Sequence, residues 1–251
     1  MNVNFDMKDF NCSELEKEKK IHYELTKKYF RKSATFKKGY YTNINTEELK
    51  QQIRKRDMWD IYSSSLNEIL QNNSESKSVI DVGCGMGSFT LELVNREQFK
   101  KIVGIDFLKE TFRLTYENTK LFERATFIEG DLLSIPFNDR SFDITICLNV
   151  LHHIHFKDFN NAIQELARIT DKYLILEIRN KRNIFNFWRN HITLPIFYND
   201  LPIYTTSTSN VNDLMINHNF QLQTVGKKAL LSQICDRLVL TYKRTDLENF
   251  Y

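Results

Sequence analysis

Three glycines, Gly83, Gly85 and Gly87, stand at alternate positions directly after a short β-branched run, and apolar residues at helical spacing follow them. A strand, a glycine turn and a helix in this order bring backbone close to a ligand. The helix N-terminus adds unpaired N–H groups and a partial positive charge. Asp106 and Asp131 end the next two apolar runs, and an acidic residue about 20 positions beyond such a turn can accept both hydroxyls of a ribose. These residues predict a nucleoside-binding crevice, in which Asp131 would pair with an amino-bearing base edge.

The competing ligand for this turn is a dinucleotide, whose fingerprint is GxGxxG. Here the third glycine comes one residue early, at Gly87, and Ser88 follows it. The glycines could also serve the turns alone, and the aspartates could be helix caps. Because three signals recur at three successive strand ends, the sequence favours one nucleoside held in an extended pose.

Strands and helices alternate from residue 78 to residue 178, which implies βαβ crossovers and a parallel sheet covered on both faces. We therefore predict a doubly wound α/β fold. The expected strands are residues 79–82, 101–106, 125–128, 142–148 and 172–178, followed by two closing strands at 220–225 and 236–242.

Residues 1–75 are predicted to form an N-terminal helical extension with two amphipathic helices. The first helix should break at residues 37–41, and the second should run from residue 45 to about Leu70. Residues 76–245 form the core, with an insert at 180–205. We expect the extension and the insert to fold over the crevice as a lid and to set acceptor specificity, through the aromatic residues Tyr40, Tyr41, Trp59, Phe185, Trp188 and Tyr198. Trp59 could equally fill the core between extension and sheet.

The composition of the 251 residues, 41% hydrophobic and 27% charged, is that of a soluble globular protein. A net charge of +3 neither argues for a nucleic-acid partner nor excludes one. The four cysteines form no CxxC pair, so reduced thiols and a cytoplasmic location are predicted. The first 20 residues are too charged for a secretory signal, and no apolar run is long enough for a membrane span.

Basic residues at positions 27–38 alternate with aromatic ones, as in nucleic-acid-binding surfaces. The alternative is the solvated face of an amphipathic helix. Acidic residues at positions 14–24 dilute the positive field and favour the second interpretation.

The motifs of this chain resemble those of the class I S-adenosylmethionine-dependent methyltransferases. Residues 81–87 resemble the first motif, residues 104–107 the second and residues 130–132 the third, while residues 142–144 and 148–154 resemble the fourth. The resemblance covers residues 77–178 closely and the closing strands more loosely. It implies a seven-stranded sheet with the last strand antiparallel, and S-adenosylmethionine as cofactor.

By the same resemblance, backbone at Gly83 and Gly85 holds the methionine moiety, and Asp106 takes the ribose hydroxyls. Phe107 packs on the adenine, while Asp131 and Leu132 read its edge. The cofactor-binding residues implied in this way are Asp81, Gly83, Cys84, Gly85, Gly87, Asp106, Phe107, Asp131, Leu132, Leu148 and Asn149.

Two features of the chain depart from the family or narrow it. Residues 169–172 replace the Pro-Gly-Gly turn that often precedes the fifth strand. Residues 148–153 resemble the motif of small-molecule methyltransferases rather than the Asn/Asp-Pro-Pro-Tyr/Phe motif of enzymes that methylate exocyclic or amide nitrogens. We therefore favour methyl transfer to a small molecule. The alternatives are an RNA methyltransferase, and a cofactor-binding module of a larger complex without activity of its own.

His152 and His153 follow the fourth predicted strand, where the acceptor should bind. Either could be a general base, because imidazole titrates near neutral pH. The alternative is that one caps the next helix or lines the pocket. With His155 they could suggest a metal site, but such tight spacing without a carboxylate or cysteine partner is poor ligand geometry, so no metal is predicted.

Overall fold

The computed structural model describes residues 12–41, 58–72, 77–111, 123–183, 203–228 and 235–246. Within residues 12–41 it describes the side chains of residues 16–31 only. Tyr40 and Tyr41 are therefore placed as backbone only. The described residues do not include Phe185, Trp188 and Tyr198, nor most of the predicted insert, nor residues 73–76.

The described residues form a seven-stranded sheet in the order β3-β2-β1-β4-β5-β7-β6. The first five strands pair in parallel, whereas β7 is antiparallel to both of its neighbours. The prediction of a doubly wound α/β sheet with an antiparallel last strand is confirmed. The strands are β1 (Ser78–Val82), β2 (Lys101–Asp106), β3 (Ala125–Glu129), β4 (Phe142–Cys147), β5 (Thr170–Arg179), β6 (Phe220–Gly226) and β7 (Arg237–Arg244).

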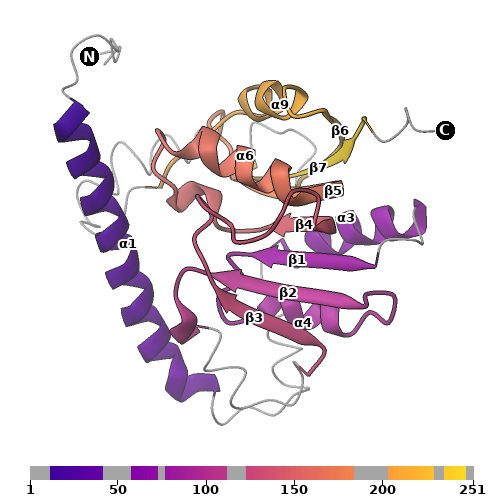
Figure 1. Cartoon of the computed structure of the whole chain (residues 1–251), viewed down its shortest axis with the longest axis horizontal. Helices are drawn as coiled ribbons and strands as arrows, with labels where there is room; N and C mark the ends of the chain where they lie inside the picture. Colours follow the sequence, from indigo (N-terminus) through magenta and orange to yellow (C-terminus); the bar gives the residue numbers. More distant parts are fainter. Residues whose placement is uncertain are drawn as a thin grey trace.

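Helices cover both faces of the sheet because its central strands are apolar on both sides. Figure 1 shows α3 (Trp59–Asn72) and α4 (Ser88–Val94) behind the sheet, and α6 (Phe159–Ile169) and α9 (Thr208–Ile216) on the opposite side. Each face has its own buried cluster: Leu66 and Leu91 pack with Ile144 on one, and Leu166 and Met215 pack with Leu174 on the other.

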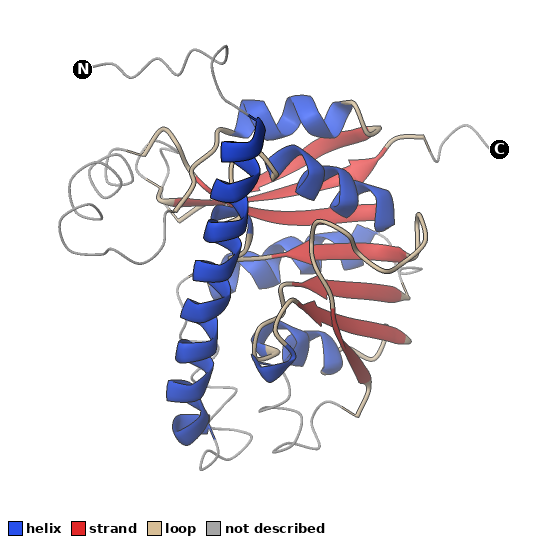
Figure 2. Cartoon of the chain, turned by 60° about the vertical axis from the view of Figure 1, so that its left-hand side comes forward, coloured by secondary structure: helices blue, strands red, loops and turns tan. Residues whose placement is uncertain are grey.

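Helix α1 (Cys12–Tyr41) is a long helix that crosses the carboxyl ends of the parallel strands (Figures 1 and 2). The predicted break at residues 37–41 was wrong, because the helix continues through Tyr41. Gly39 costs a helix only about 1 kcal/mol relative to alanine, which a helix of 30 residues tolerates.

Helix α3 starts at Trp59, directly after Met58, whose φ of 72° is incompatible with a right-handed helix. The predicted continuous helix from residue 45 to Leu70 was therefore wrong at Met58, where it is interrupted, and its predicted start lies outside the described residues. The amphipathic pattern predicted for this segment is confirmed, since its five apolar residues at helical spacing are buried: Met58, Trp59, Tyr62, Leu66 and Ile69. The domain boundary at residue 75 stays a prediction, although α3 shares one hydrophobic cluster with the sheet.

The chain after β4 makes a short 3-10 helix, η2 (Leu151–His153), before α6 begins at Phe159. Phe156 precedes α6, outside its buried apolar stripe, and is 53% exposed. The segment between η2 and α6 is thus a loop, and it brings His155 and Asp158 toward α1.

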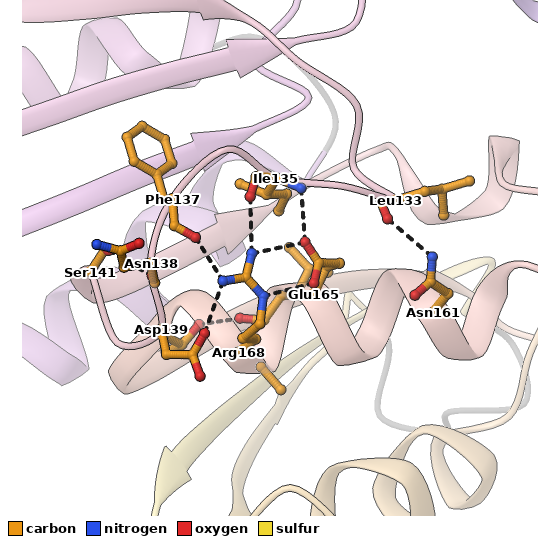
Figure 3. Close-up of polar contacts among 12 residues, drawn as sticks. Leu133, Ile135, Phe137, Asn138, Asp139, Ser141, Asn161, Glu165 and Arg168 are labelled. Atoms are coloured by element: carbon orange, nitrogen blue, oxygen red, sulfur yellow. Dashed lines mark hydrogen bonds and ion pairs between the residues drawn. The ribbon is translucent and has the colours of Figure 1, made fainter.

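Arg168 of α6 fastens the loop that follows Asp131 (Figure 3). Its guanidinium donates hydrogen bonds to the carbonyls of Ile135 (2.9 Å) and Phe137 (2.6 Å) and pairs with Glu165 (2.7 Å). The Glu165 carboxylate in turn accepts the N–H of Ile135 at 2.8 Å. The loop that begins after β3 and contains Asp131 is therefore attached to α6 at Ile135 and Phe137.

In the described part of the chain, no helix has the length and hydrophobicity needed to span a membrane. The cytoplasmic location stays a prediction from the cysteine content of the sequence.

We expect Arg168→Ala to lower the free energy of unfolding by about 2 kcal/mol, because two loop carbonyls and Glu165 lose their donor. Urea denaturation measures this. Lys109→Ala is the control, since Lys109 pairs with Glu129 only at 4.0 Å between exposed side chains and should change the free energy by less than about 0.5 kcal/mol. Equal effects of the two substitutions would contradict the role assigned to Arg168.

Candidate functional site

A cavity of about 520 Å³ opens at the carboxyl ends of β1, β2, β3 and β4, beneath α1. It lies where doubly wound sheets bind ligands, at the point where the strand order reverses. Ten of the eleven predicted cofactor-binding residues line it: Asp81, Gly83, Cys84, Gly85, Asp106, Phe107, Asp131, Leu132, Leu148 and Asn149. The eleventh, Gly87, is the N-cap residue of α4 and is not part of the lining.

The glycine turn between β1 and α4 has left-handed backbone at Gly83, Gly85 and Gly87, with φ of 75°, 53° and 74°. Such φ values favour glycine. A Cβ at Gly83 would lie 2.2 Å from Val150, so this glycine allows protein to pack on the turn. A Cβ at Gly85 would meet no atom within 4 Å. Gly85 therefore leaves room at the cavity wall for a ligand to approach the backbone.

Asp106, the last residue of β2, fixes this turn. One oxygen of its carboxylate accepts the N–H of Gly85 at 2.9 Å, and the other accepts the N–H of Leu108 at 3.0 Å. Burial raises the pKa of Asp106 to about 6, although these two hydrogen bonds oppose the rise. The carboxylate is ionised at pH 7 and retains lone pairs for further donors.

Asp81 stands at the floor of the same crevice and accepts a hydrogen bond from the Thr90 hydroxyl of α4 at 2.6 Å. Burial also raises its pKa, to about 6, while the Thr90 hydrogen bond lowers it and the charge of Asp106 raises it. Two buried carboxylates thus share the floor of the crevice.

Asp131 lies at the end of the cavity where β3 ends. Its carboxylate accepts the N–H of Leu133 at 2.9 Å through one of its two oxygens. Phe107 lies between Asp106 and α1, and its ring centroid is 6.2 Å from that of Tyr23 and 6.0 Å from that of Phe30. This end of the cavity therefore offers a flat apolar ring beside hydrogen-bonding groups, which suits a base.

Of the two candidate bases, His153 lines the cavity, whereas His152 is buried and is not part of the lining. Burial lowers the pKa of His153 to about 4, and the charges of Arg179 and His22 add to this. The ring is therefore neutral at pH 7. Its Nδ1 has no hydrogen-bond partner within the described residues.

The roof of the cavity comes from α1, whose side chains His22, Tyr23, Thr26 and Phe30 line it. His22 donates from Nε2 to the carbonyl of His153 at 2.8 Å, and Lys19 pairs with Asp158 at 2.7 Å. Glu18 of α1 also faces His155 at 3.5 Å. Helix α1 is thus held on the loop after β4 by polar contacts.

These α1 residues were not predicted as site residues, because the apolar stripe of this helix, Ile21, Leu25 and Tyr29, is exposed and another face of the helix lines the cavity. Tyr62 and Arg237 also line the cavity and were not predicted. Trp59 was predicted and lines it, packed against Phe89 with ring centroids 5.4 Å apart. It also belongs to the buried cluster of that sheet face, so the alternative that Trp59 fills the core between extension and sheet is confirmed, and its role in acceptor specificity stays a prediction.

Among the described residues, no group of three or more histidine, cysteine, aspartate or glutamate side chains is arranged to hold a metal ion. His22, His153 and His155 lie close together, but their contacts are with carbonyl groups, rings and Glu18.

Residues 79–172 match a family model described as a methyltransferase domain. The chain is 34% identical over 93 residues to the uncharacterized methyltransferase YcgJ of Bacillus subtilis, which is 36% of this chain and 35% of that protein. It is 32% identical over 94 residues to a demethylmenaquinone methyltransferase of Deinococcus radiodurans, 37% of this chain and 38% of the relative. The chain thus spans little more than a third of the length of these two relatives.

The solved structure of magnesium protoporphyrin IX methyltransferase from Synechocystis PCC 6803, with bound S-adenosylhomocysteine, superposes with a TM-score of 0.62. The superposition covers 85% of this chain and 95% of that one at 20% identity. At this identity the likeness establishes the fold.

We expect Asp81→Asn to change how stability depends on pH. The native Asp81 carboxyl holds its proton up to about pH 6, whereas the unfolded one releases it near 3.8. The native state therefore binds more protons than the unfolded state between these values, and Asp81 costs stability as the pH rises through that window. Asparagine can still accept the Thr90 hydrogen bond without this cost. The stability of the variant relative to the wild type should rise by about 2 kcal/mol between pH 4 and 7.

Chemical denaturation at a series of pH values measures this difference. Asp213→Asn on α9 is the control, because Asp213 is exposed and its substitution should leave the pH dependence of the wild type in place. Parallel curves for Asp81→Asn and the wild type would contradict the assignment.

Proposed function

We propose that this chain, whose residues 79–172 match a family model of a methyltransferase domain, transfers the methyl group of S-adenosylmethionine to a small-molecule acceptor. The observation that carries the proposal is the Asp106 carboxylate, buried beside the open wall at Gly85 and in contact with its backbone. When bound, S-adenosylmethionine supplies a methyl group on a positively charged sulfur, and the protein aligns the acceptor with it.

The residues present fit this cofactor. The two oxygens of Asp106 each accept one backbone N–H and keep lone pairs that two ribose hydroxyls could use. Phe107 offers a ring face for the adenine, with Asp131 and Leu132 beside it. The backbone of Gly83, Gly85 and Leu148–Asn149 would hold the methionine moiety.

What the chain contributes to the reaction is alignment and exclusion of water. Helix α1 roofs the cavity with Tyr23, Thr26 and Phe30, so a bound acceptor would be screened from solvent. Holding two reactants in line in this way can lower a barrier by up to about 7–11 kcal/mol.

A histidine base, if the acceptor needs one, is His153 in this proposal, because it borders the cavity and His152 does not. His153 is neutral at pH 7 and can accept a hydrogen bond at Nδ1. Its low pKa makes it a weak base, suited to orienting an acceptor more than to removing a proton from it.

Two observations support a small-molecule acceptor. One is the motif at residues 148–153, and the other is the set of acceptors named for the similar proteins. Two of these proteins are methyltransferases of demethylmenaquinone and of magnesium protoporphyrin IX, both organic small molecules. Tyr40, Tyr41 and Trp188 stay predicted acceptor-binding residues, because their side chains lie outside the described part of the chain.

We expect Asp106→Ala to weaken the binding of S-adenosylhomocysteine about 10- to 100-fold, since hydrogen bonds to a charged group are lost. Isothermal titration calorimetry measures the dissociation constant. Asp213→Ala, which removes an exposed carboxylate on α9, should bind as the wild type does. Unchanged affinity in Asp106→Ala, with the fold intact by circular dichroism, would refute the site.

Activity is tested with S-adenosylmethionine that carries a radiolabelled methyl group, incubated with the protein and a fractionated cell extract. A labelled small molecule should form with the wild type and not with Asp106→Ala. Tight binding of S-adenosylhomocysteine without transfer to any fraction would instead indicate a binding module. Transfer only to RNA fractions, with binding that falls steeply with salt, would indicate an RNA substrate.

A further inference from the structure

Glu177 of β5 is a carboxylate that the proposed function leaves unused. It is 0% exposed, and a buried carboxylate is costly unless other groups satisfy it. One of its oxygens accepts a hydrogen bond from the hydroxyl of Tyr62 on α3, whereas the other has no hydrogen-bond partner within the described residues. Such a group in a hydrophobic face of a sheet calls for a functional explanation.

Tyr62 connects Glu177 to the cavity. Tyr62 lines the cavity, together with Trp59, Phe89 and Arg237, and Glu177 lies behind it at the other end of the hydrogen bond. Because α3 packs on β5, β6 and β7, Tyr62 lies toward that edge of the sheet, whereas β2 and β3 lie at the other edge.

The cavity therefore has two chemically different ends. The end at β2 and β3 holds Asp106, Phe107 and Asp131, which suit a nucleoside. The other end, beyond the glycine turn, holds Tyr62 and Arg237. A cofactor with its nucleoside at the first end and its methionine on the glycine turn would direct its methyl group toward the second.

Tyr62 can act at this second end only as a hydrogen-bond acceptor while its own proton is donated to Glu177. Its phenolic oxygen then has lone pairs for an O–H group of a ligand. The rings of Trp59 and Phe89, beside it, form an apolar wall that suits a flat ring. Arg237 supplies a positive charge nearby, which would stabilise an oxygen that becomes negative.

We propose that this end of the cavity binds an acceptor with an aromatic hydroxyl group. Tyr62 is the catalytic residue that receives the hydroxyl proton of the acceptor. Glu177 is the positioning residue behind Tyr62. The inference rests on the proposed methyl transfer and names the class of acceptor. As the acceptor oxygen bonds to the methyl carbon, its O–H proton moves to the oxygen of Tyr62, and the proton of Tyr62 moves to Glu177. The electron pair of the broken sulfur–carbon bond stays on sulfur, so charge and atoms balance without a further reagent.

The environment of Glu177 suits this role. Burial raises the pKa of its carboxyl above the ordinary value, while the Tyr62 hydrogen bond and the charges of Arg237 and Arg179 lower it. A carboxylate with a raised pKa takes up a proton more readily than an exposed one. A phenol is a suitable proton source, because its O–H is far more acidic than that of an aliphatic alcohol.

The experiment compares two probes, para-cresol and its methyl ether para-methylanisole. In the ether, a methyl group replaces the hydroxyl hydrogen, so it cannot donate a hydrogen bond. Each is titrated by ligand-observed NMR into the protein saturated with S-adenosylhomocysteine. We expect the wild type to bind para-cresol about tenfold more tightly, as one buried hydrogen bond allows. In Tyr62→Phe the two probes should bind alike. Tyr173→Phe is the matched control, because Tyr173 is a buried tyrosine of the same cluster that does not line the cavity, and it should keep the preference.

Tyr62→Phe leaves Glu177 without its donor, so its thermal unfolding is measured first. If it does not fold, the double variant Tyr62→Phe/Glu177→Gln replaces it, because glutamine removes the buried charge. No preference for para-cresol in the wild type, or a preference that survives the loss of the Tyr62 hydroxyl, would overturn the inference. If the wild type does not bind S-adenosylhomocysteine in the calorimetric titration, the proposed function itself is refuted. This titration contains neither probe, so its outcome is independent of the para-cresol comparison.

Discussion

The pairing of the Asp106 carboxylate with backbone N–H groups is the interaction on which the candidate site depends. Asp106 ends β2, yet it reaches back to Gly85 in the loop after β1 and forward to Leu108. One side chain thus fixes the distance between two parallel strand ends and the shape of the glycine turn. The backbone at Gly85 is left-handed, and a Cβ there would meet no atom within 4 Å. The turn can therefore hold this shape and still admit a ligand.

Burial of charge is the common property of the side chains around the cavity. Asp81, Asp106 and Glu177 are all buried, and burial raises the pKa of each carboxyl. Each is held by one or more hydrogen bonds from Thr90, from backbone N–H groups or from Tyr62. Burying a carboxylate costs stability, so the arrangement is typical of a site where stability is given up for chemistry.

The sheet and the place of the cavity at the glycine turn could be predicted because their signals are local. The apolar runs define the strands, and the glycines and Asp106 stand at fixed positions along the chain. The side chains of α1 and α3 that line the cavity could not be predicted, because their places depend on contacts between distant segments, such as Tyr62 with Glu177 and His22 with His153. The sequence held one usable signal: Glu177 is a lone acidic residue between Leu176 and Ile178 in an apolar strand. The predicted helix break failed for a related reason, since a single glycine is a weak breaker in a long helix.

Helix α1 gives the molecule a roof that is fastened by polar contacts rather than by a broad apolar interface. Lys19 with Asp158 and His22 with the carbonyl of His153 lie at the rim of the cavity, while the apolar residues Ile21, Leu25 and Tyr29 face outward. Opening these rim contacts would widen the path to the space beneath α1. The exchange of bound molecules is therefore coupled to the position of α1, and a step that moves α1, rather than bond making, can limit the rate of the proposed methyl transfer.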